Sequence, residues 1–261
     1  MKDHKKIKES VKEKYASIAK STDNCCCCSN KETDYSAFNE NYSEVNGYFK
    51  DADLNLGCGL PTEHASIKKG DAVLDLGSGA GNDCFIAREI VGDDGKVVGL
   101  DFTDEMINKA NKNLQSSSYK NMEFVKGDIE NIPLKENSFN VVISNCVLNL
   151  VPDKEKAFSE IHRTLKKGGH FCVSDIVLKG DLPEEIRNTA MLYAGCVSGA
   201  LQKEEYLNII KEKGFKNIEI KKERQLQVPD KIFLEYISEE ELNRFKALGT
   251  GIFSITVLGE K

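Results

Sequence analysis

The stretch Val73-Leu-Asp-Leu-Gly-Ser-Gly-Ala-Gly81 decides the fold of this chain. Its first half is apolar, and its second half carries glycine at every other position. The residues that follow, 82–91, place apolar side chains at helical spacing. The pattern predicts a strand over 72–76, a tight turn over 77–81 and a helix over 82–91. Glycines let the backbone approach a ligand closely, and the helix start offers unpaired N–H donors, so we expect a ligand at this turn.

The same alternation of short apolar runs and amphipathic stretches continues to residue 178. We expect four more strands, at 96–100, 122–125, 140–144 and 170–178. Helices are expected after the N-cap Thr103 and over 153–165, where Gly168 and Gly169 stop the second one. Near-continuous apolar strands in such a βαβα pattern predict an α/β fold with a doubly wound, mostly parallel sheet.

The pattern changes after residue 178. A helical insertion is expected around 183–200, and a further helix over 204–213. Two strand-like runs, 217–222 and 252–258, could pair as an antiparallel hairpin at the sheet edge. We therefore divide the chain into an N-terminal helical, cysteine-rich extension (1–50), a Rossmann-like core (51–180), and a C-terminal part (181–261) that covers the site and adds the last strands.

Composition excludes several classes of function. The 261 residues carry a net charge of −6, which argues against a nucleic-acid partner. No apolar run approaches the ~20 residues that span a bilayer, and no signal-peptide core follows the N-terminus. We expect a cytoplasmic protein without a membrane partner. Residues 1–20 hold seven lysines and an apolar stripe, which fits either a lid packed on the domain or a membrane or partner helix. The mixed charges of its polar face favour the lid.

Two acidic residues support a cofactor site beside the glycine turn. Asp101 closes the second strand, 26 residues after Asp75, where a carboxylate can accept both ribose hydroxyls. Asp128 follows the third strand. A dinucleotide fingerprint would place its last glycine at position 82, where Asn82 stands. The form Asp-x-Gly-x-Gly-x-Gly instead resembles the first motif of class I S-adenosylmethionine-dependent methyltransferases.

Further motifs carry the same resemblance. Phe139-Asn-Val-Val-Ile-Ser-Asn145 resembles the fourth motif of that superfamily, with Asn140 in place of the usual Asp. The resemblance implies that Asp128 reads the adenine amino group. The cofactor-binding residues expected from it are Asp75, Gly77, Ser78, Gly79, Gly81, Asp101, Phe102, Met106, Asp128, Ile129 and Asn145.

The nine cysteines indicate what accepts the methyl group. Cys58, Cys146 and Cys196 stand in loop-like settings flanked by Gly or Asn, and these segments can converge above the carboxyl edge of the sheet. Thiolates select thiophilic acceptors. Three of them suit a trigonal-pyramidal ion such as arsenite, whose lone pair could attack a sulfonium methyl group.

At these cysteines the chain resembles the arsenite S-adenosylmethionine methyltransferases. The motifs are Leu-Gly-Cys-Gly-x-Pro at Cys58, Ser-Asn-Cys-Val-x-Asn-Leu at Cys146 and Gly-Cys-x-Ser-Gly-Ala at Cys196, and the resemblance covers about residues 35–200. It implies that the three thiolates form the catalytic arsenic site. It also implies a thiol reductant, of the glutathione or thioredoxin type, as co-reactant.

Other readings of the cysteines stay open. The run Cys25–Cys28 could be a thiol relay or capture segment, and its Cys-x-x-Cys spacing is formally that of a zinc site. Cys84 and Cys172 are expected to be core packing. Asp175, at the end of a strand, fits equally a residue that lines the site and a buried paired carboxylate.

The predicted activity is methylation of thiol-bound arsenite or its thiol conjugates for detoxification, by a protein that needs no more than a monomer. The alternatives are methylation of a small organic acceptor, and a metalloid-binding protein without turnover.

Overall fold

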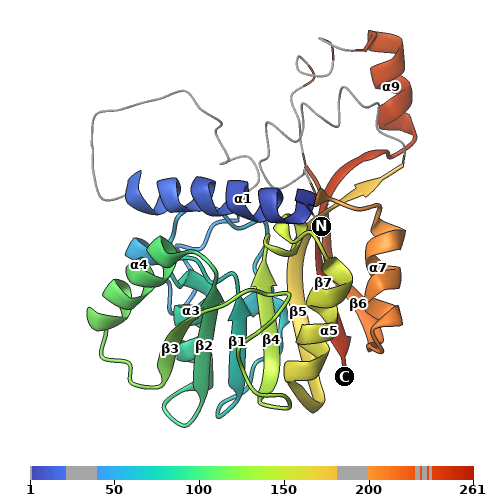
Figure 1. The fold of residues 1–261 in the computed structure, drawn as a ribbon. Coiled ribbons are helices and arrows are strands. Elements are labelled where there is room, and N and C mark those ends of the chain that lie inside the picture. The colour runs from blue at the N-terminus through green and yellow to red at the C-terminus, as the bar shows by residue number, and fades with distance from the viewer. Residues whose placement is uncertain (1, 22–39, 181–198, 227–229, 231–233, 235–236) are drawn as a thin grey trace.

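The strands form one seven-stranded sheet in the order β3-β2-β1-β4-β5-β7-β6 (Figure 1). The computed structural model describes residues 2–21, 40–180, 199–226, 230, 234 and 237–261. The strands are β1 (Ala72–Leu76), β2 (Lys96–Asp101), β3 (Met122–Lys126), β4 (Phe139–Asn145), β5 (Leu165–Lys179), β6 (Lys216–Gln225) and β7 (Gly251–Glu260). The expected α/β class and the doubly wound sheet are confirmed.

The helices are α1 (Lys2–Ser21), α2 (Pro61–His64), α3 (Asn82–Val91), α4 (Asp104–Gln115), α5 (Lys154–Thr164), α7 (Lys203–Glu212) and α9 (Glu239–Ala247). Two short 3-10 helices, η2 (Lys50–Ala52) and η3 (Leu148–Leu150), lie in loops. Strand β1 and helix α3 have the predicted limits, because the glycine turn separates them sharply.

The first five strands pair in parallel, which brings their carboxyl ends to one edge of the sheet. Strand β7 is antiparallel both to β5 and to β6. The predicted antiparallel pairing of the last two strands is therefore confirmed. The connection places β7 between β5 and β6, so that β6 forms the edge.

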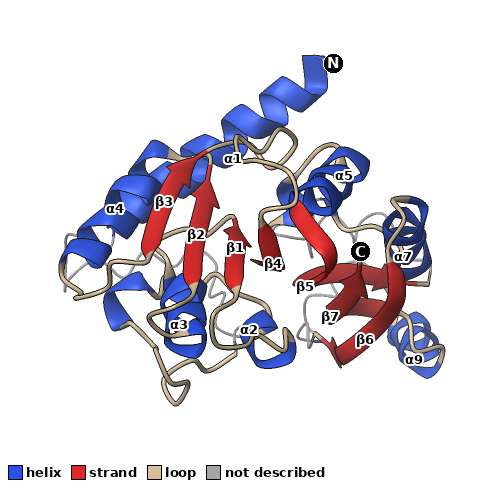
Figure 2. Ribbon diagram, turned by 90° about the horizontal axis from the view of Figure 1, so that it is seen from below, coloured by secondary structure: helices blue, strands red, loops and turns tan. Residues whose placement is uncertain are grey.

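Helices cover both faces of the sheet (Figure 2). Helices α2 and α3 lie on one face, where Phe85 and Val91 pack against strand residues of a core that also holds Cys172. Helices α5 and α7 lie on the other face, where Phe158 and Tyr206 belong to the larger apolar core. Burial on both faces explains why these strands are apolar almost throughout.

Some predicted limits were wrong. Helix α5 ends at Thr164, before the two glycines expected to stop it, and β5 begins directly at Leu165. The reason lies in pairing between distant segments, since Leu165 pairs with Phe139 of β4 and the backbone of Gly168 and Gly169 bonds that of Lys261. Thr103 precedes α4 as expected, but its side chain makes no capping bond. The helical insertion expected around 183–200 lies almost wholly outside the described residues.

Helix α1 lies across the edge of the sheet where the parallel strands end (Figure 1). Ion pairs join it to that edge: Lys8 pairs with Asp128 and Glu130 in the loop after β3, and Lys12 pairs with Asp104 at the start of α4. This placement agrees with the lid interpretation of residues 1–20. Among the described residues, no helix has both the length and the apolar character needed to cross a membrane.

Candidate active site

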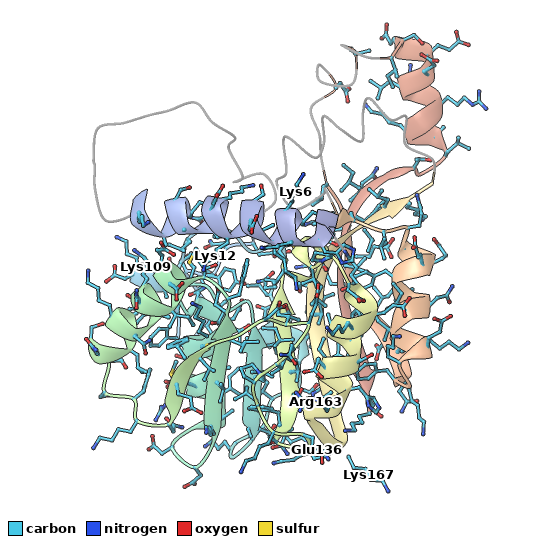
Figure 3. The ribbon with its side chains drawn as sticks, viewed as in Figure 1. Lys6, Lys12, Lys109, Glu136, Arg163 and Lys167 are labelled. Carbon is cyan, nitrogen blue, oxygen red and sulfur yellow. The ribbon has the colours of Figure 1, made fainter. Side chains whose placement is uncertain are left out.

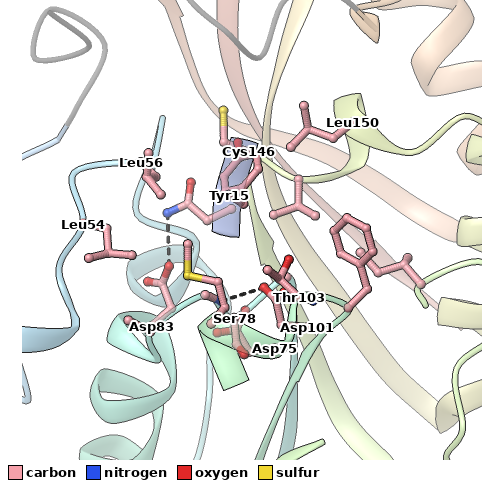
Figure 4. A pocket seen from close by; sticks show the side chains of 18 of the residues that line it. Tyr15, Leu54, Leu56, Asp75, Ser78, Asp83, Asp101, Thr103, Cys146 and Leu150 are labelled. Carbon is pink, nitrogen blue, oxygen red and sulfur yellow. Dashed lines mark hydrogen bonds between the residues drawn. The ribbon is translucent and has the colours of Figure 1, made fainter. Parts of the chain in front are cut away.

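A pocket opens where β1, β2 and β4 end, and α1 contributes to its wall. Its empty space is about 1110 Å³, part of it open to solvent. Lys8, Val11 and Tyr15 of α1 line it (Figure 4). Ten of the expected cofactor residues line it as well: Asp75, Gly77, Ser78, Gly79, Asp101, Phe102, Met106, Asp128, Ile129 and Asn145. Gly81 is not among the lining residues.

The glycine turn has the backbone that its sequence predicts. Gly77, Gly79 and Gly81 have φ values of +70°, +52° and +100°, in the region that other residues adopt only with strain. A Cβ at Gly77 would come within 2.4 Å of Val147, so only glycine fits there. A Cβ at Gly79 would meet only the Met106 sulfur, at 3.9 Å, so space is open beside this backbone. Gly81 is the N-cap of α3 and shapes the turn.

Asp101 holds the turn from the end of β2. Its carboxylate accepts hydrogen bonds from the backbone N–H of Gly79, at 3.1 Å, and of Thr103, at 2.8 Å. Burial raises the pKa of Asp101, while these backbone donors act in the opposite direction. Each oxygen keeps acceptor capacity for a ligand in the pocket.

Asp128 lines the pocket and contacts α1. Its carboxylate accepts from Lys8 Nζ at 2.7 Å and from the backbone N–H of Glu130 at 2.9 Å. Lys8 therefore uses part of the hydrogen-bond acceptor capacity of the Asp128 carboxylate. By the family resemblance, this carboxylate is expected to bind the adenine amino group.

Asp75 and Cys84 form a buried pair under the glycine turn. The Cys84 thiol donates to Asp75 Oδ2 at 3.2 Å. Desolvation raises the pKa of Asp75 well above its usual value, and the nearby charge of Asp83 acts in the same direction. Cys84 is thus more than packing, because its thiol satisfies a buried carboxyl group.

Cys146 and Cys58 approach the pocket from different elements. Cys146 follows β4, adopts a φ of +61°, lines the pocket (Figure 4), and donates its backbone N–H to Ser174 O at 2.7 Å. Cys58 is buried in the loop before α2 and is not among the lining residues. Its N–H donates to Asn145 Oδ1 at 3.1 Å, so the residue before Cys146 holds the backbone of Cys58.

Tyr206 is fully buried in the larger apolar core. Desolvation raises its pKa most, followed by the charge of Asp175, and the charges of Cys58 and Cys146 both add to the shift. Cys196, the third predicted ligand, lies outside the described residues, as does the run Cys25–Cys28. Within the described part of the chain, no three Cys, His, Asp or Glu side chains lie close enough to hold a metal ion.

Cys172 and Asp175 lie in β5 away from the pocket. Cys172 is fully buried, and desolvation raises its pKa to about 12. Asp175 is also fully buried, and its carboxylate accepts from Tyr206 Oη at 3.2 Å and from the N–H of Ile176 at 3.0 Å. Of the two readings of Asp175, the buried paired carboxylate is the one the structure supports.

Asp83 and Tyr42 were missed in the sequence, although both line the pocket. The Asp83 carboxylate lies 3.3 Å from Tyr42 Oη and accepts from Asn145 Nδ2 at 3.1 Å (Figure 4). Asp83 is the second residue after the glycine turn, so its place in the chain could have marked it. Tyr42 stands 41 residues before Asp83 with no motif around it.

The pocket fits S-adenosylmethionine. Ser78 Oγ and Asn82 Oδ1 are buried at its wall and have no hydrogen-bond partner within the described residues. Such polar atoms are expected to bind a ligand. Open space beside Gly79 and the acidic ends of β1 and β2 suit the amino-acid end and the ribose of this cofactor.

The sheet order, the glycine turn and the pocket together define a class, that of the S-adenosylmethionine-dependent methyltransferases. The methyltransferase domain family matches residues 67–214. An arsenite methyltransferase from Halobacterium salinarum is 38% identical over an alignment of 279 positions, gaps included. The alignment covers 99% of this chain and 68% of that protein. Another, from Aquipseudomonas alcaligenes, is 34% identical over 70% of this chain, which spans about half (54%) of its length.

A solved structure gives the same result. An arsenic (III) S-adenosylmethionine methyltransferase from Chlamydomonas reinhardtii superposes with a TM-score of 0.66 at 31% identity, covering 84% of this chain and 70% of that one. The chain belongs to the arsenite methyltransferase family.

Proposed function

We propose that this chain methylates trivalent arsenic held by Cys58, Cys146 and Cys196, with S-adenosylmethionine as the methyl donor. One observation carries the proposal. Asn145 holds the backbone of Cys58 and directly precedes Cys146, at the wall of the pocket that fits the cofactor. This contact joins the Cys58 backbone to the residue before Cys146, and it supports the proposal that both thiols serve one methyl-donor pocket.

When bound, S-adenosylmethionine supplies an electrophilic methyl group on a sulfonium centre. The arsenic lone pair would attack the methyl carbon, so that an As–C bond would form as the C–S bond breaks and its electron pair stays on the sulfur of the demethylated cofactor. Arsenic would thereby be formally oxidised from the trivalent to the pentavalent state. Two of the arsenic-bound thiolates would then couple to a disulfide, leaving two electrons on arsenic, which would return to the trivalent state as free thiol takes the vacated position. No general base is required, because the nucleophile carries no proton.

The chain's own residues position these partners. The thiolates hold the arsenic, Asp101 and Ser78 bind the cofactor, and α1 covers the pocket and limits the access of water. A thiol reductant of the glutathione or thioredoxin type must reduce the disulfide before the next cycle. The site therefore suits a reducing compartment such as the cytoplasm, and a monomer contains all three proposed thiols. The division into an extension (1–50), a core (51–180) and a C-terminal part (181–261) stays part of the proposal.

Methyl-labelled S-adenosylmethionine and glutathione, with and without arsenite, test the reaction. We expect labelled methylated arsenicals only when arsenite is present. A labelled organic product in place of an arsenical would indicate an organic acceptor. Stoichiometric retention of arsenite without labelled product would indicate a binding protein, and either result would overturn the proposal.

A further inference from the structure

The side-chain amide of Asn145 contacts both the pocket and the Cys58 loop. Its Nδ2 donates to Asp83 Oδ2 at 3.1 Å and to Gly59 O at 2.8 Å, and its Oδ1 accepts from the Cys58 N–H at 3.1 Å. Asp83 belongs to the pocket wall, whereas Gly59 and Cys58 belong to the loop. A single amide group therefore joins the two sites.

Tyr42 makes a second connection between the same partners. Its hydroxyl donates to Gly59 O at 2.9 Å and lies 3.3 Å from both oxygens of Asp83. The loop packs closely against Asn145, because a Cβ at Gly57 would come within 2.7 Å of Asn145 Nδ2. Its other side is held by Ser254, whose Oγ donates to Cys58 O at 2.6 Å.

The hydrogen-bond partners of Asn145 together decide how its amide points. Asp83 and Gly59 O accept from Nδ2, and the Cys58 N–H donates to Oδ1. Asp83 is 8% exposed, and desolvation raises its pKa to about 6, while the bonds from Asn145 and Tyr42 act in the opposite direction. An ionised carboxylate only accepts hydrogen bonds, so it keeps Nδ2 of Asn145 facing it and Oδ1 facing Cys58. A reversed amide would place its NH2 group against the N–H of Cys58, two donors without an acceptor.

We propose that Asp83 and Asn145 are positioning residues that couple the two sites, so that a cationic cofactor beside Asp83 fixes the Cys58 loop and tightens the binding of trivalent metalloid. The inference rests on the proposed function for the identity of the metalloid. The cofactor carries positive charge on its sulfonium and ammonium groups, and in a buried pocket such charge stabilises an ionised carboxylate strongly. Its affinity is therefore higher for the state in which Asn145 holds the loop, and this difference is what a ligand needs to shift a population.

Equilibrium dialysis of arsenite, with and without saturating sinefungin, measures the coupling. Sinefungin is an unreactive cofactor analogue with an amine in place of the methylsulfonium group. In the wild-type protein we expect it to lower the dissociation constant of arsenite at least ~5-fold. Because coupling is reciprocal, calorimetry should find the affinity for sinefungin raised by arsenite to the same degree.

Substitutions test whether these residues carry the coupling between cofactor and arsenite binding or only support the fold. In Asp83→Asn the coupling factor should fall to within about twofold of one, whereas the exposed matched change Asp94→Asn should keep the wild-type factor. Asn145→Ser should lose the same coupling, and the double variant should lose no more than either single one, because the two residues act in one chain of contacts. Tyr42→Phe keeps the buried ring and should reduce the factor; it decides the matter if Asp83→Asn does not fold.

The results that would overturn this inference differ from those that would overturn the proposed function. A wild-type protein that binds and methylates arsenite with a coupling factor of one overturns the inference and leaves the proposed function standing. The same holds if Asp83→Asn, or Tyr42→Phe in its place, keeps the wild-type factor. A protein that binds no arsenite overturns both.

Discussion

At the scale of single residues, Cys146 occupies the most constrained position among the described thiols. Its φ of +61° lies in the left-handed region, which non-glycine residues rarely adopt. The bond from its N–H to Ser174 O, in the neighbouring strand β5, holds this backbone at the end of β4. This turn places Cys146 at the wall of the pocket (Figure 4).

Cys146→Ser should reduce arsenite methylation at least ~100-fold, because a hydroxyl does not replace a thiolate as a ligand of a soft acceptor. Cys172→Ser is the matched control, since Cys172 is also buried but packs in the core as part of β5. Its activity per folded molecule should stay within about threefold of wild type, although a buried hydroxyl there costs roughly 1–3 kcal/mol of stability. Labelled product per unit of folded protein measures both. Equal activity of the two variants would contradict the three-thiol site.

Asp175→Asn should remove a pH dependence of stability. Burial raises the pKa of Asp175 to about 7, with the charge of Lys154 acting in the opposite direction. A raised carboxyl pKa means that the folded state binds the proton more tightly, so the stabilisation is full below about pH 4 and is lost as pH rises towards 7. The wild-type protein should therefore lose stability relative to the variant between about pH 5 and pH 8, by up to the order of 3 kcal/mol. Urea unfolding at both pH values measures this, and parallel profiles would contradict it.

At the scale of elements, α1 is the one helix that crosses the edge of the sheet over the pocket (Figure 1), as far as the structure describes the chain. Val11 and Tyr15 of this helix line the pocket, and ion pairs at Lys8, Lys12 and Lys20 hold the helix in place. Most of these pairs are partly exposed and therefore weak and sensitive to salt. Such a helix can open for cofactor exchange without disturbing the core.

Lys8→Gln should loosen α1, because Lys8 contacts both Asp128 and the buried Glu130. We expect trypsin to cleave within α1 roughly 2–5 times faster, the effect of a pair worth up to about 1 kcal/mol. Lys6→Gln is the control, since Lys6 lies on the outer side of the helix (Figure 3) and its loss removes one tryptic site as well. S-adenosylmethionine should protect α1 in both the wild-type protein and the control. Equal cleavage rates for the two variants would show that the Lys8 pairs do not hold the helix.

At the scale of the whole molecule, β7 completes the sheet from the far end of the chain. Nine of its ten residues are buried, and it pairs with β5 along ten positions and with β6 on its other side. Among the described strands, β6 pairs with β7 alone, so it belongs to the sheet only through β7. The described residues of α7 and β7 also share one apolar core with β1, the strand that leads into the cofactor pocket.

Removal of residues 251–261 should abolish cooperative folding, because it exposes β5 and detaches β6 from the sheet. Removal of residues 1–21 should keep the fold, since α1 lies outside the main cores. Circular dichroism during heating distinguishes the two, with a single sharp transition expected only for the second truncation. A cooperative transition after loss of β7 would show that the first five strands fold independently.

The sequence by itself determined the local elements and the kind of cofactor. The limits of β1 and α3, the glycine turn and the acidic ends of β1 and β2 follow from short-range patterns, in which neighbouring residues set the backbone. The family resemblance predicted the class of protein and the thiol chemistry of its site. The comparisons confirm the family.

Only the tertiary structure decided how distant segments meet. Helix α5 ends early because β5 begins in pairing with β4, and Lys8 contacts Asp128 although 120 residues separate them. Asp83 and Tyr42 join the site for the same reason: their hydrogen bonds to Asn145 and Gly59 form across segments with no periodic relation in the sequence. Periodicity reports which face of an element is buried, whereas contacts between elements depend on how the whole chain packs.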